Sequence, residues 1–224
     1  LSSVVTESFR ALRTSILFSS PEDKPLKTML VTSTVLGEGK SFISSNLTAI
    51  FSHVNEKTIL LDVDMRRPKL HKLFNIDQRP GLSAFLTGNA SLESIIRPVP
   101  SSHISIITSG AIPPNPSELL SSGKIRSLLE ELKSKFDRII LDSPPVLNVA
   151  DTSLLANSVD GVILVIKGAS TRLDGVIASK KRILEAKGRI LGVVLNNVEL
   201  EREDHYYYHY YYSQDQGKDK QKKA

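Results

Sequence analysis

The stretch Lys27 to Ser41 reads KTMLVTSTVLGEGKS, and it decides the expected fold of this 224-residue chain. Its first half, KTMLVTS, is a short apolar run typical of a buried strand, and its second half, TVLGEGKS, is a glycine-rich turn. Residues 41–54 then have the pattern of a helix. A turn between a buried strand and a helix directs backbone N–H groups and the helix dipole toward bound phosphate. The stretch therefore indicates a phosphate-binding loop.

Short apolar runs and helical patterns alternate through the rest of the chain. Strands are predicted at 57–62, 103–108, 138–142, 161–166 and 190–196, and helices at 117–136 and 171–186. This alternation indicates an α/β fold: a mostly parallel sheet covered by helices on both faces, as in P-loop NTPases. Such sheets bind ligands beyond the carboxyl ends of their strands. We therefore expect the functional side chains just after the strands.

The glycine-rich turn matches most of the general phosphate-loop pattern G-x-x-x-x-G-K-[ST]. Thr34 stands where the first glycine of the pattern is expected, and Gly37 partly makes up for it. Lys40 is expected to reach the β- and γ-phosphates, and Ser41 to ligate Mg²⁺. An ordinary turn that happens to contain G-K-S is the alternative. The predicted nucleotide-binding residues here are Gly37, Glu38, Gly39, Lys40, Ser41 and Phe42.

Three aspartates follow two of the predicted strands. Asp142 ends the run RIILD, and Asp62 and Asp64 end and follow the run KTILLD. A carboxylate that ends a strand near a phosphate loop is placed to organise Mg²⁺. Asp62 and Asp64 are two residues apart, so one of them can bind the metal while the other takes a proton from an incoming hydroxyl. A single aspartate here is more often a turn or helix cap, but three beside G-E-G-K-S favour an active site.

The amino-terminal segment has the pattern of an amphipathic helix. Its apolar residues recur at spacings of four, three and four: Val5, Phe9, Leu12 and Ile16. Glu7, Arg10 and Arg13 fall on a different face. By themselves these charges indicate a solvated stripe with one i,i+3 ion pair.

All six tyrosines lie in residues 206–212, interrupted only by His209. The apolar pattern stops near residue 199, so the remainder cannot bury enough apolar surface to offset the entropy of ordering. We therefore predict one domain, residues 1–198, and a flexible tail, residues 199–224. A phenol in such a tail can be reached by an enzyme and can accept a phosphoryl group. The predicted acceptors are Tyr206, Tyr207, Tyr208, Tyr210, Tyr211 and Tyr212.

Composition narrows the class of protein further. The absence of cysteine excludes disulfides and thiolate metal sites, and the apolar runs are too short to span a bilayer. Basic residues cluster at positions 66–72, but no element that reads nucleic acid accompanies them, so no nucleic-acid partner is expected. The chain starts at Leu1 and not at a methionine, which favours, weakly, a piece of a longer protein.

Taken together and in this order, the motifs resemble the bacterial tyrosine kinases known as BY-kinases. The resemblance rests on five segments: E-x-x-R-x-x-R at 7–13, G-E-G-K-S at 37–41, D-x-D-x-R at 62–66, D-S-P-P at 142–145 and the tyrosine cluster at 206–212. Pro80-Gly81-Leu82 is also similar to the family's pattern. One departure is Leu36, where the family usually has proline; it removes no ligand.

The resemblance implies transfer of a phosphoryl group from ATP, with Mg²⁺, to tyrosine. It implies that Asp62 is the base, that Asp64 and Asp142 hold Mg²⁺ beside Ser41, and that Lys40 is catalytic. By analogy with related nucleotide-binding folds, Asn196 or Asn197 is expected near adenine. The amino-terminal residues Glu7, Arg10 and Arg13 resemble the family's subunit-contact motif.

The resemblance also implies partners and a location. We expect a homo-oligomer in which each tail enters a neighbour's site, a membrane-spanning activator segment, fused or separate, and a cognate tyrosine phosphatase. The expected location is cytoplasmic, at the inner face of the cell membrane, in polysaccharide polymerisation and export. The main rival is a partition or division-site ATPase, but such proteins carry a second lysine where this chain has Val35. A non-catalytic scaffold with an aromatic tail, and a metal site at His205 and His209, are weaker alternatives.

Overall fold

A computed structural model describes residues 3–21 and 24–198 of the chain, so the predictions for the tail at 199–224 lie outside the described residues. The fold is built on one sheet with the strand order β3-β4-β2-β5-β1-β6-β7. Its strands are β1 (Thr28–Ser33), β2 (Thr58–Asp62), β3 (Arg97–Pro98), β4 (Ile104–Ile107), β5 (Arg138–Asp142), β6 (Gly161–Lys167) and β7 (Ile190–Asn196). All pairings are parallel except β3 with β4. The predicted mostly parallel sheet is confirmed.

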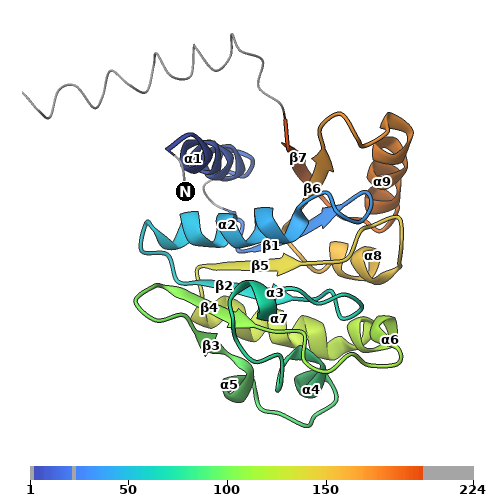
Figure 1. The fold of residues 1–224 in the computed structure, drawn as a ribbon. Helices are drawn as coiled ribbons and strands as arrows, with labels where there is room; N and C mark the ends of the chain where they lie inside the picture. Colours follow the sequence, from blue (N-terminus) through green and yellow to red (C-terminus); the bar gives the residue numbers. More distant parts are fainter. Residues whose placement is uncertain (1–2, 22–23, 199–224) are drawn as a thin grey trace, which may run out of the picture.

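Helices cover both faces of this sheet (Figure 1). They are α1 (Ser3–Phe18), α2 (Lys40–Ser52), α3 (Leu70–Leu73), α4 (Leu82–Leu86), α5 (Leu92–Ile95), α6 (Pro116–Ser121), α7 (Gly123–Lys135), α8 (Asp151–Ala156) and α9 (Leu173–Glu185). One apolar core joins the sheet to α4–α9, and the other joins its opposite face to α1–α3. Strands buried on both faces need this double cover.

The first helix, α1, lies outside α2 as an extra layer, visible at the top of Figure 1. Its Phe9 and Ile16 are buried in the core on that side, which confirms the predicted apolar stripe. Among the described residues, none of the helices combines the length and apolarity that a bilayer crossing requires.

One predicted helix is two helices. The spacing predicts a continuous helix over 117–136, whereas α6 ends at Ser121 and α7 begins at Gly123. Ser122 between them is extended, with φ −65° and ψ 144°. Leucines lie on either side of the break, at Leu120 and Leu128, and both are buried. Because the apolar spacing continues across this single non-helical residue, the break cannot be recognised from the sequence pattern.

The strand register brings the predicted carboxylates together. In the β2–β5 ladder Asp62 is paired with Asp142, and in the β1–β5 ladder Val31 is paired with the same Asp142. Since parallel strands end on the same edge of the sheet, the phosphate loop after β1 and both aspartates share the carboxyl edge. The fold thereby assembles one site from segments that lie 80 residues apart.

Candidate active site

The phosphate loop joins β1 to α2 through two glycines with left-handed backbones. Gly37 has φ 85° and Gly39 has φ 95°. Thr34, where the general pattern has its first glycine, is not among the described residues with positive φ. An L-residue is therefore unstrained at that position. The backbone of this loop therefore does not require glycine at position 34, although the general sequence pattern has one there.

The side chain of Glu38 stabilises the phosphate loop by accepting two hydrogen bonds. Its side chain is 3% exposed; Oε2 accepts a hydrogen bond from Val35 N (2.9 Å), and Oε1 accepts one from the Thr171 hydroxyl. Thr171 also accepts from Lys167 N (2.8 Å), at the end of β6. The carboxylate of Glu38 is thus occupied in fixing the loop. It is therefore not available to phosphate, and Thr171 is a site-supporting residue that the sequence did not reveal.

Asn196 contacts the same loop from the end of β7. Its Nδ2 donates to Glu38 O at 2.9 Å, and a Cβ added at Gly39 would lie 2.1 Å from that nitrogen. Gly39 is therefore required both by its left-handed φ and by the close approach of Asn196. Asn197 is exposed, with φ 56°. The structure brings Asn196 to the phosphate loop; contact of either asparagine with adenine stays a prediction.

Lys40 and Asp64 form a buried ion pair. Lys40 Nζ lies 3.3 Å from Asp64 Oδ2, with side chains 8% and 3% exposed. That oxygen has no partner with hydrogen-bond geometry. The other oxygen, Oδ1, accepts from Arg67 N at 2.9 Å, which fixes the carboxylate. The lysine expected to bind phosphate thus lies beside Asp64, the carboxylate predicted to hold Mg²⁺.

Asp62 and Asp142 are fully buried next to one another and are strongly perturbed. Burial, followed by repulsion from Asp142, raises the pKa of Asp62 to about 8. Burial raises the pKa of Asp142 to about 6, although Lys40 and the Ser41 hydroxyl oppose the shift. Burial disfavours the charged form, and two neighbouring carboxylates resist ionising together. Such shifts in a cleft are typical of functional sites.

The three carboxylates fit a divalent cation with phosphate. Asp62 Oδ1, Asp64 Oδ2 and Asp142 Oδ1 are buried with no hydrogen-bond partner. Asp64 Oδ2 faces Lys40 Nζ, whereas a cation or a proton would relieve the unfavourable state of the oxygens of Asp62 and Asp142. Within the described residues no group of three or more potential ligands forms a ready metal cage. Mg²⁺ is usually held by one or two carboxylates together with substrate phosphates and water, so a complete protein cage is not needed.

Arg66, the last residue of D-x-D-x-R, has a structural partner that the sequence did not predict. Its Nε donates to Asp151 Oδ2 (2.8 Å) and its Nη2 to Ser117 Oγ (2.9 Å) and Asp151 Oδ1 (3.1 Å). Ser117 donates to the same Asp151 oxygen at 2.5 Å. This network joins the segment after β2 to α6 and α8, and it holds that wall of the site in place.

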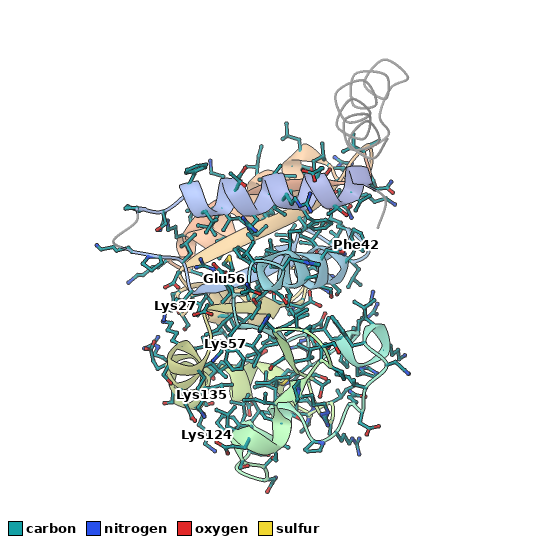
Figure 2. All side chains as sticks on the ribbon, turned by 90° about the vertical axis from the view of Figure 1, so that its left-hand side faces the viewer. Lys27, Phe42, Glu56, Lys57, Lys124 and Lys135 are labelled. Atoms are coloured by element: carbon teal, nitrogen blue, oxygen red, sulfur yellow. The ribbon has the colours of Figure 1, made fainter. Side chains whose placement is uncertain are left out.

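Several cavities open at this edge. One of about 180 Å³ has Asp64, Arg66 and the two prolines at 144–145 in its wall. A larger one, about 730 Å³, runs from the phosphate loop at Lys40 and Ser41 to Arg67 and α3. Phe42, labelled in Figure 2, lines this larger cavity and is 46% exposed, and its ring is edge-on to that of Phe9 with the centroids 5.9 Å apart. The predicted nucleotide-binding residue Phe42 is therefore also a contact between α1 and α2.

The predicted interface residues lie on α1, away from the carboxylates. Arg10 pairs with Glu7, as the i,i+3 spacing predicts, and it remains 60% exposed. Arg13 Nε is buried with no partner, at a cavity of about 500 Å³ that also borders Arg10 and His53. These cations are thus presented outward or toward a hollow, and their role at a subunit contact stays a prediction.

Comparisons with known proteins agree with this geometry. A family model described as ParA, NUBPL iron-transfer P-loop NTPase, matches residues 25–224. The tyrosine-protein kinase YwqD of Bacillus subtilis is 36% identical over 204 residues, which is 91% of this chain and 86% of that protein. The kinase domain of the Escherichia coli tyrosine kinase ETK superposes with a TM-score of 0.83 at 35% identity, covering 86% of this chain and 75% of that one.

The chain belongs to the bacterial tyrosine-protein kinases. The chimerical protein CapA2B2 has a similar fold, with a TM-score of 0.85 at 33% identity over 89% of this chain and 87% of that one. Longer curated relatives, such as Etk of Escherichia coli, are spanned for only 26% of their length. A plasmid partition protein from Borrelia burgdorferi and a septum site-determining protein from Pyrococcus horikoshii match at 20% and 24% identity, and they share the fold alone. The kinase has no cysteine, so thiolate binding of iron is excluded.

Proposed function

We propose that this kinase transfers the γ-phosphoryl group of ATP, with Mg²⁺, to the tyrosine cluster of its own tail. One observation carries the proposal. The phosphate loop and three buried carboxylates, each with an oxygen that accepts no hydrogen bond, meet at the carboxyl edge of the sheet, where Asp62 and Asp142 are paired in register. A site that must bind phosphate and metal and accept a proton needs these groups, whereas a structural edge does not.

Each residue has a role that follows from its position. Lys40 would leave Asp64 and bind the β- and γ-phosphates, while the backbone of 37–41 surrounds them. Ser41, Asp64 and Asp142 would hold Mg²⁺, which neutralises charge developing on the phosphates. Because Lys69 N and Leu70 N both donate to Asp62 Oδ2 (3.1 Å each), only Oδ1 is free to accept the tyrosine proton.

The pKa of Asp62 suits a general base. A base works best when its pKa lies near the working pH, because it is then ionised often enough and still holds a proton. Burial places Asp62 at about 8 in the nucleotide-free chain. Asp142, at about 6, ionises first and is the better metal ligand of the two.

We propose transfer between molecules. In the sheet, β7 is separated from β2 by β6, β1 and β5, which is about 19 Å at ~4.8 Å per strand spacing. The eight residues from Val198 to Tyr206 span at most about 28 Å. A tail that reached its own Asp62 would use about two thirds of this length only to cross the sheet. A neighbour docked through Glu7, Arg10 and Arg13 could instead present its tail without this constraint, in a homo-oligomer.

The wider setting is part of the proposal. The names of the relatives and the motif set support a role in capsule or exopolysaccharide polymerisation and export. We propose a cytoplasmic position at the inner face of the membrane, a membrane-spanning activator on the same or another chain, and a cognate tyrosine phosphatase. The domain would comprise residues 1–198, with residues 1–20 as its oligomerisation region and residues 199–224 as a flexible acceptor tail.

Intact-mass spectrometry tests the proposal. Pure protein incubated with Mg-ATP should gain phosphates on tyrosine, and a variant with phenylalanine at all six positions should gain none. Mixing full-length Lys40→Met protein with active protein truncated after residue 198 tests transfer between molecules: phosphate should appear on the Lys40→Met chain. Absence of phosphotyrosine in wild-type protein would refute the kinase proposal. Absence of phosphate on the Lys40→Met chain in the mixture, with wild-type protein phosphorylated, would refute transfer between molecules.

A further inference from the structure

The wall of the larger cavity carries three cations that the proposed chemistry does not use. Arg67, Lys69 and Lys72 line the same cavity of about 730 Å³ as Lys40 and Ser41, and all three are exposed. None of them makes a side-chain ion pair within the part of the chain that the structure describes. Arg66, their neighbour, is by contrast fixed on Asp151. Unpaired cations beside a phosphate loop attract an anion.

The tail has an anionic segment directly before its acceptors. Residues 199–204 read ELERED, with four acidic residues and Arg202, so the net charge is −4 + 1 = −3. Tyr206 follows two residues later. An acidic stretch held by the cations at one end of the cavity would lead the tyrosines toward the phosphate loop at its other end.

We propose that Arg67, Lys69 and Lys72 form a docking site for residues 199–204 of a second copy of the chain. The site determines which tyrosine-containing segment is phosphorylated. This inference rests on the proposed phosphorylation of the tail, and it adds a mechanism by which the enzyme selects its substrate segment. The cavity also offers exposed apolar surface at Phe42 and Leu73 (46% and 56% exposed), against which phenol rings can pack.

The chain's own acidic segment has little length to spare for reaching this site. It starts at Glu199, directly after the end of β7, and β2 lies about 19 Å away across the sheet. Six residues cover at most about 21 Å, so the segment would be used up in crossing the sheet before it reached Arg67. A second copy avoids this limit, since its tail approaches from outside.

A peptide kinetic experiment tests the docking site. The enzyme is the full chain with all six tyrosines changed to phenylalanine. The substrates are a peptide of residues 199–216 and a matched peptide with Glu199→Gln, Glu201→Gln, Glu203→Gln and Asp204→Asn. The neutral peptide should have a KM about 10-fold higher with kcat within about 2-fold, as expected for exposed charges that act on binding and not on chemistry. Added salt should reduce the difference.

Charge reversal in the enzyme supplies the reciprocal test. Lys69→Glu/Lys72→Glu should raise the KM of the acidic peptide about 10-fold or more, and a peptide with lysines at the four acidic positions should regain affinity with this variant. The matched control is Lys57→Glu/Lys180→Glu, with the same change in charge at exposed positions outside the cavity; Lys57 lies at the start of β2, far from Phe42 in Figure 2. It should leave the KM unchanged.

Several results would overturn the docking site. These are equal KM values for the two peptides, a rise in the KM of ATP alone in the Lys69/Lys72 variant, or loss of binding to phosphatidylserine vesicles with an unchanged peptide KM. Binding of the fluorescein-labelled peptides, measured without ATP, separates the two proposals. If no peptide is phosphorylated but the acidic one binds 10-fold tighter than the neutral one, the kinase proposal fails and the docking site stands. Equal binding refutes the docking site.

Discussion

The amino edge and the carboxyl edge of the sheet both carry charged residues, but the two edges differ in how completely the charged groups are hydrogen-bonded or ion-paired. At the amino edge the charges are satisfied: Asp160 Oδ2 accepts from Lys27 N, Thr28 N and the Thr28 hydroxyl at 2.7–2.9 Å. Arg138 there pairs with Glu56 at 2.8 Å. At the carboxyl edge Asp62 and Asp142 are more deeply buried, yet each keeps an oxygen without a partner.

The contrast separates structural from functional charge. Lys27, Glu56 and Lys57 lie together in Figure 2, and Phe42, beside the phosphate loop, lies well apart from them. A buried carboxylate with all its hydrogen bonds stabilises the fold, whereas one without them costs free energy until a ligand arrives. Substitutions at the carboxyl edge should therefore change activity, and substitutions at the amino edge should change stability.

The largest effect is expected at Lys40. Lys40→Met should reduce phosphotyrosine formation by about 10³-fold or more, because transfer depends on neutralising the phosphate charge. Phosphorylation by radiolabelled ATP measures the loss, and an unchanged far-UV circular dichroism spectrum shows that the fold persists. Lys27→Met, at the amino edge, is the matched control and should keep wild-type activity. Equal activity in both variants would contradict the distinction between the edges.

Asp62→Asn should have the second largest effect. It preserves shape but removes the base, so nucleotide affinity should stay within about 3-fold of wild type while transfer falls by about 10²- to 10⁴-fold. In the wild-type chain, kcat/KM should rise with pH and level off above about 8, where Asp62 is ionised. A variant with the wild-type rate, or a wild-type profile that falls over this range, would show that Asp62 is not the base.

Asp160→Ala should produce a smaller effect, on stability only. It leaves the backbone N–H groups of Lys27 and Thr28 without their acceptor, and Thr28 is fully buried. An unsatisfied buried donor costs about 1–3 kcal/mol, so urea unfolding should show a loss of about 2–3 kcal/mol. Activity per folded molecule should not change. A loss of activity at temperatures where the variant is folded would mean that the two edges are coupled.

The sequence was informative where the signal is local. The phosphate loop and the aspartates could be predicted because each lies within a few residues of an apolar strand, and parallel strands end on one edge. The supporting contacts could not, because their partners are distant in the chain: Glu38 with Thr171 is separated by 133 residues, Arg66 with Asp151 by 85 and Asn196 with Glu38 by 158. No periodicity encodes such pairs.

The last prediction concerns the pH dependence of stability without nucleotide. The folded pKa values of Asp62 (about 8) and Asp142 (about 6) both lie above the unfolded value of about 3.9. Their protonated forms are therefore favoured by folding, and that contribution is lost between the unfolded pKa and the folded pKa of each group. The free energy of unfolding should fall from about pH 4, by about 1.4 kcal/mol per pH unit for each group, up to about pH 6 for Asp142 and about pH 8 for Asp62, and then level off.

Urea unfolding across this range measures the slope. Asp62→Asn/Asp142→Asn should flatten it and be more stable than wild type at pH 9, since an amide cannot acquire the buried charge. Asp160→Ala should lower the free energy of unfolding at every pH and keep the wild-type slope. Mg-ATP should remove most of the slope in the wild-type chain, because the ligand compensates the carboxylates. If the free energy of unfolding had the same pH slope in the wild type and in the double variant, ionisation of Asp62 and Asp142 would not destabilise the fold.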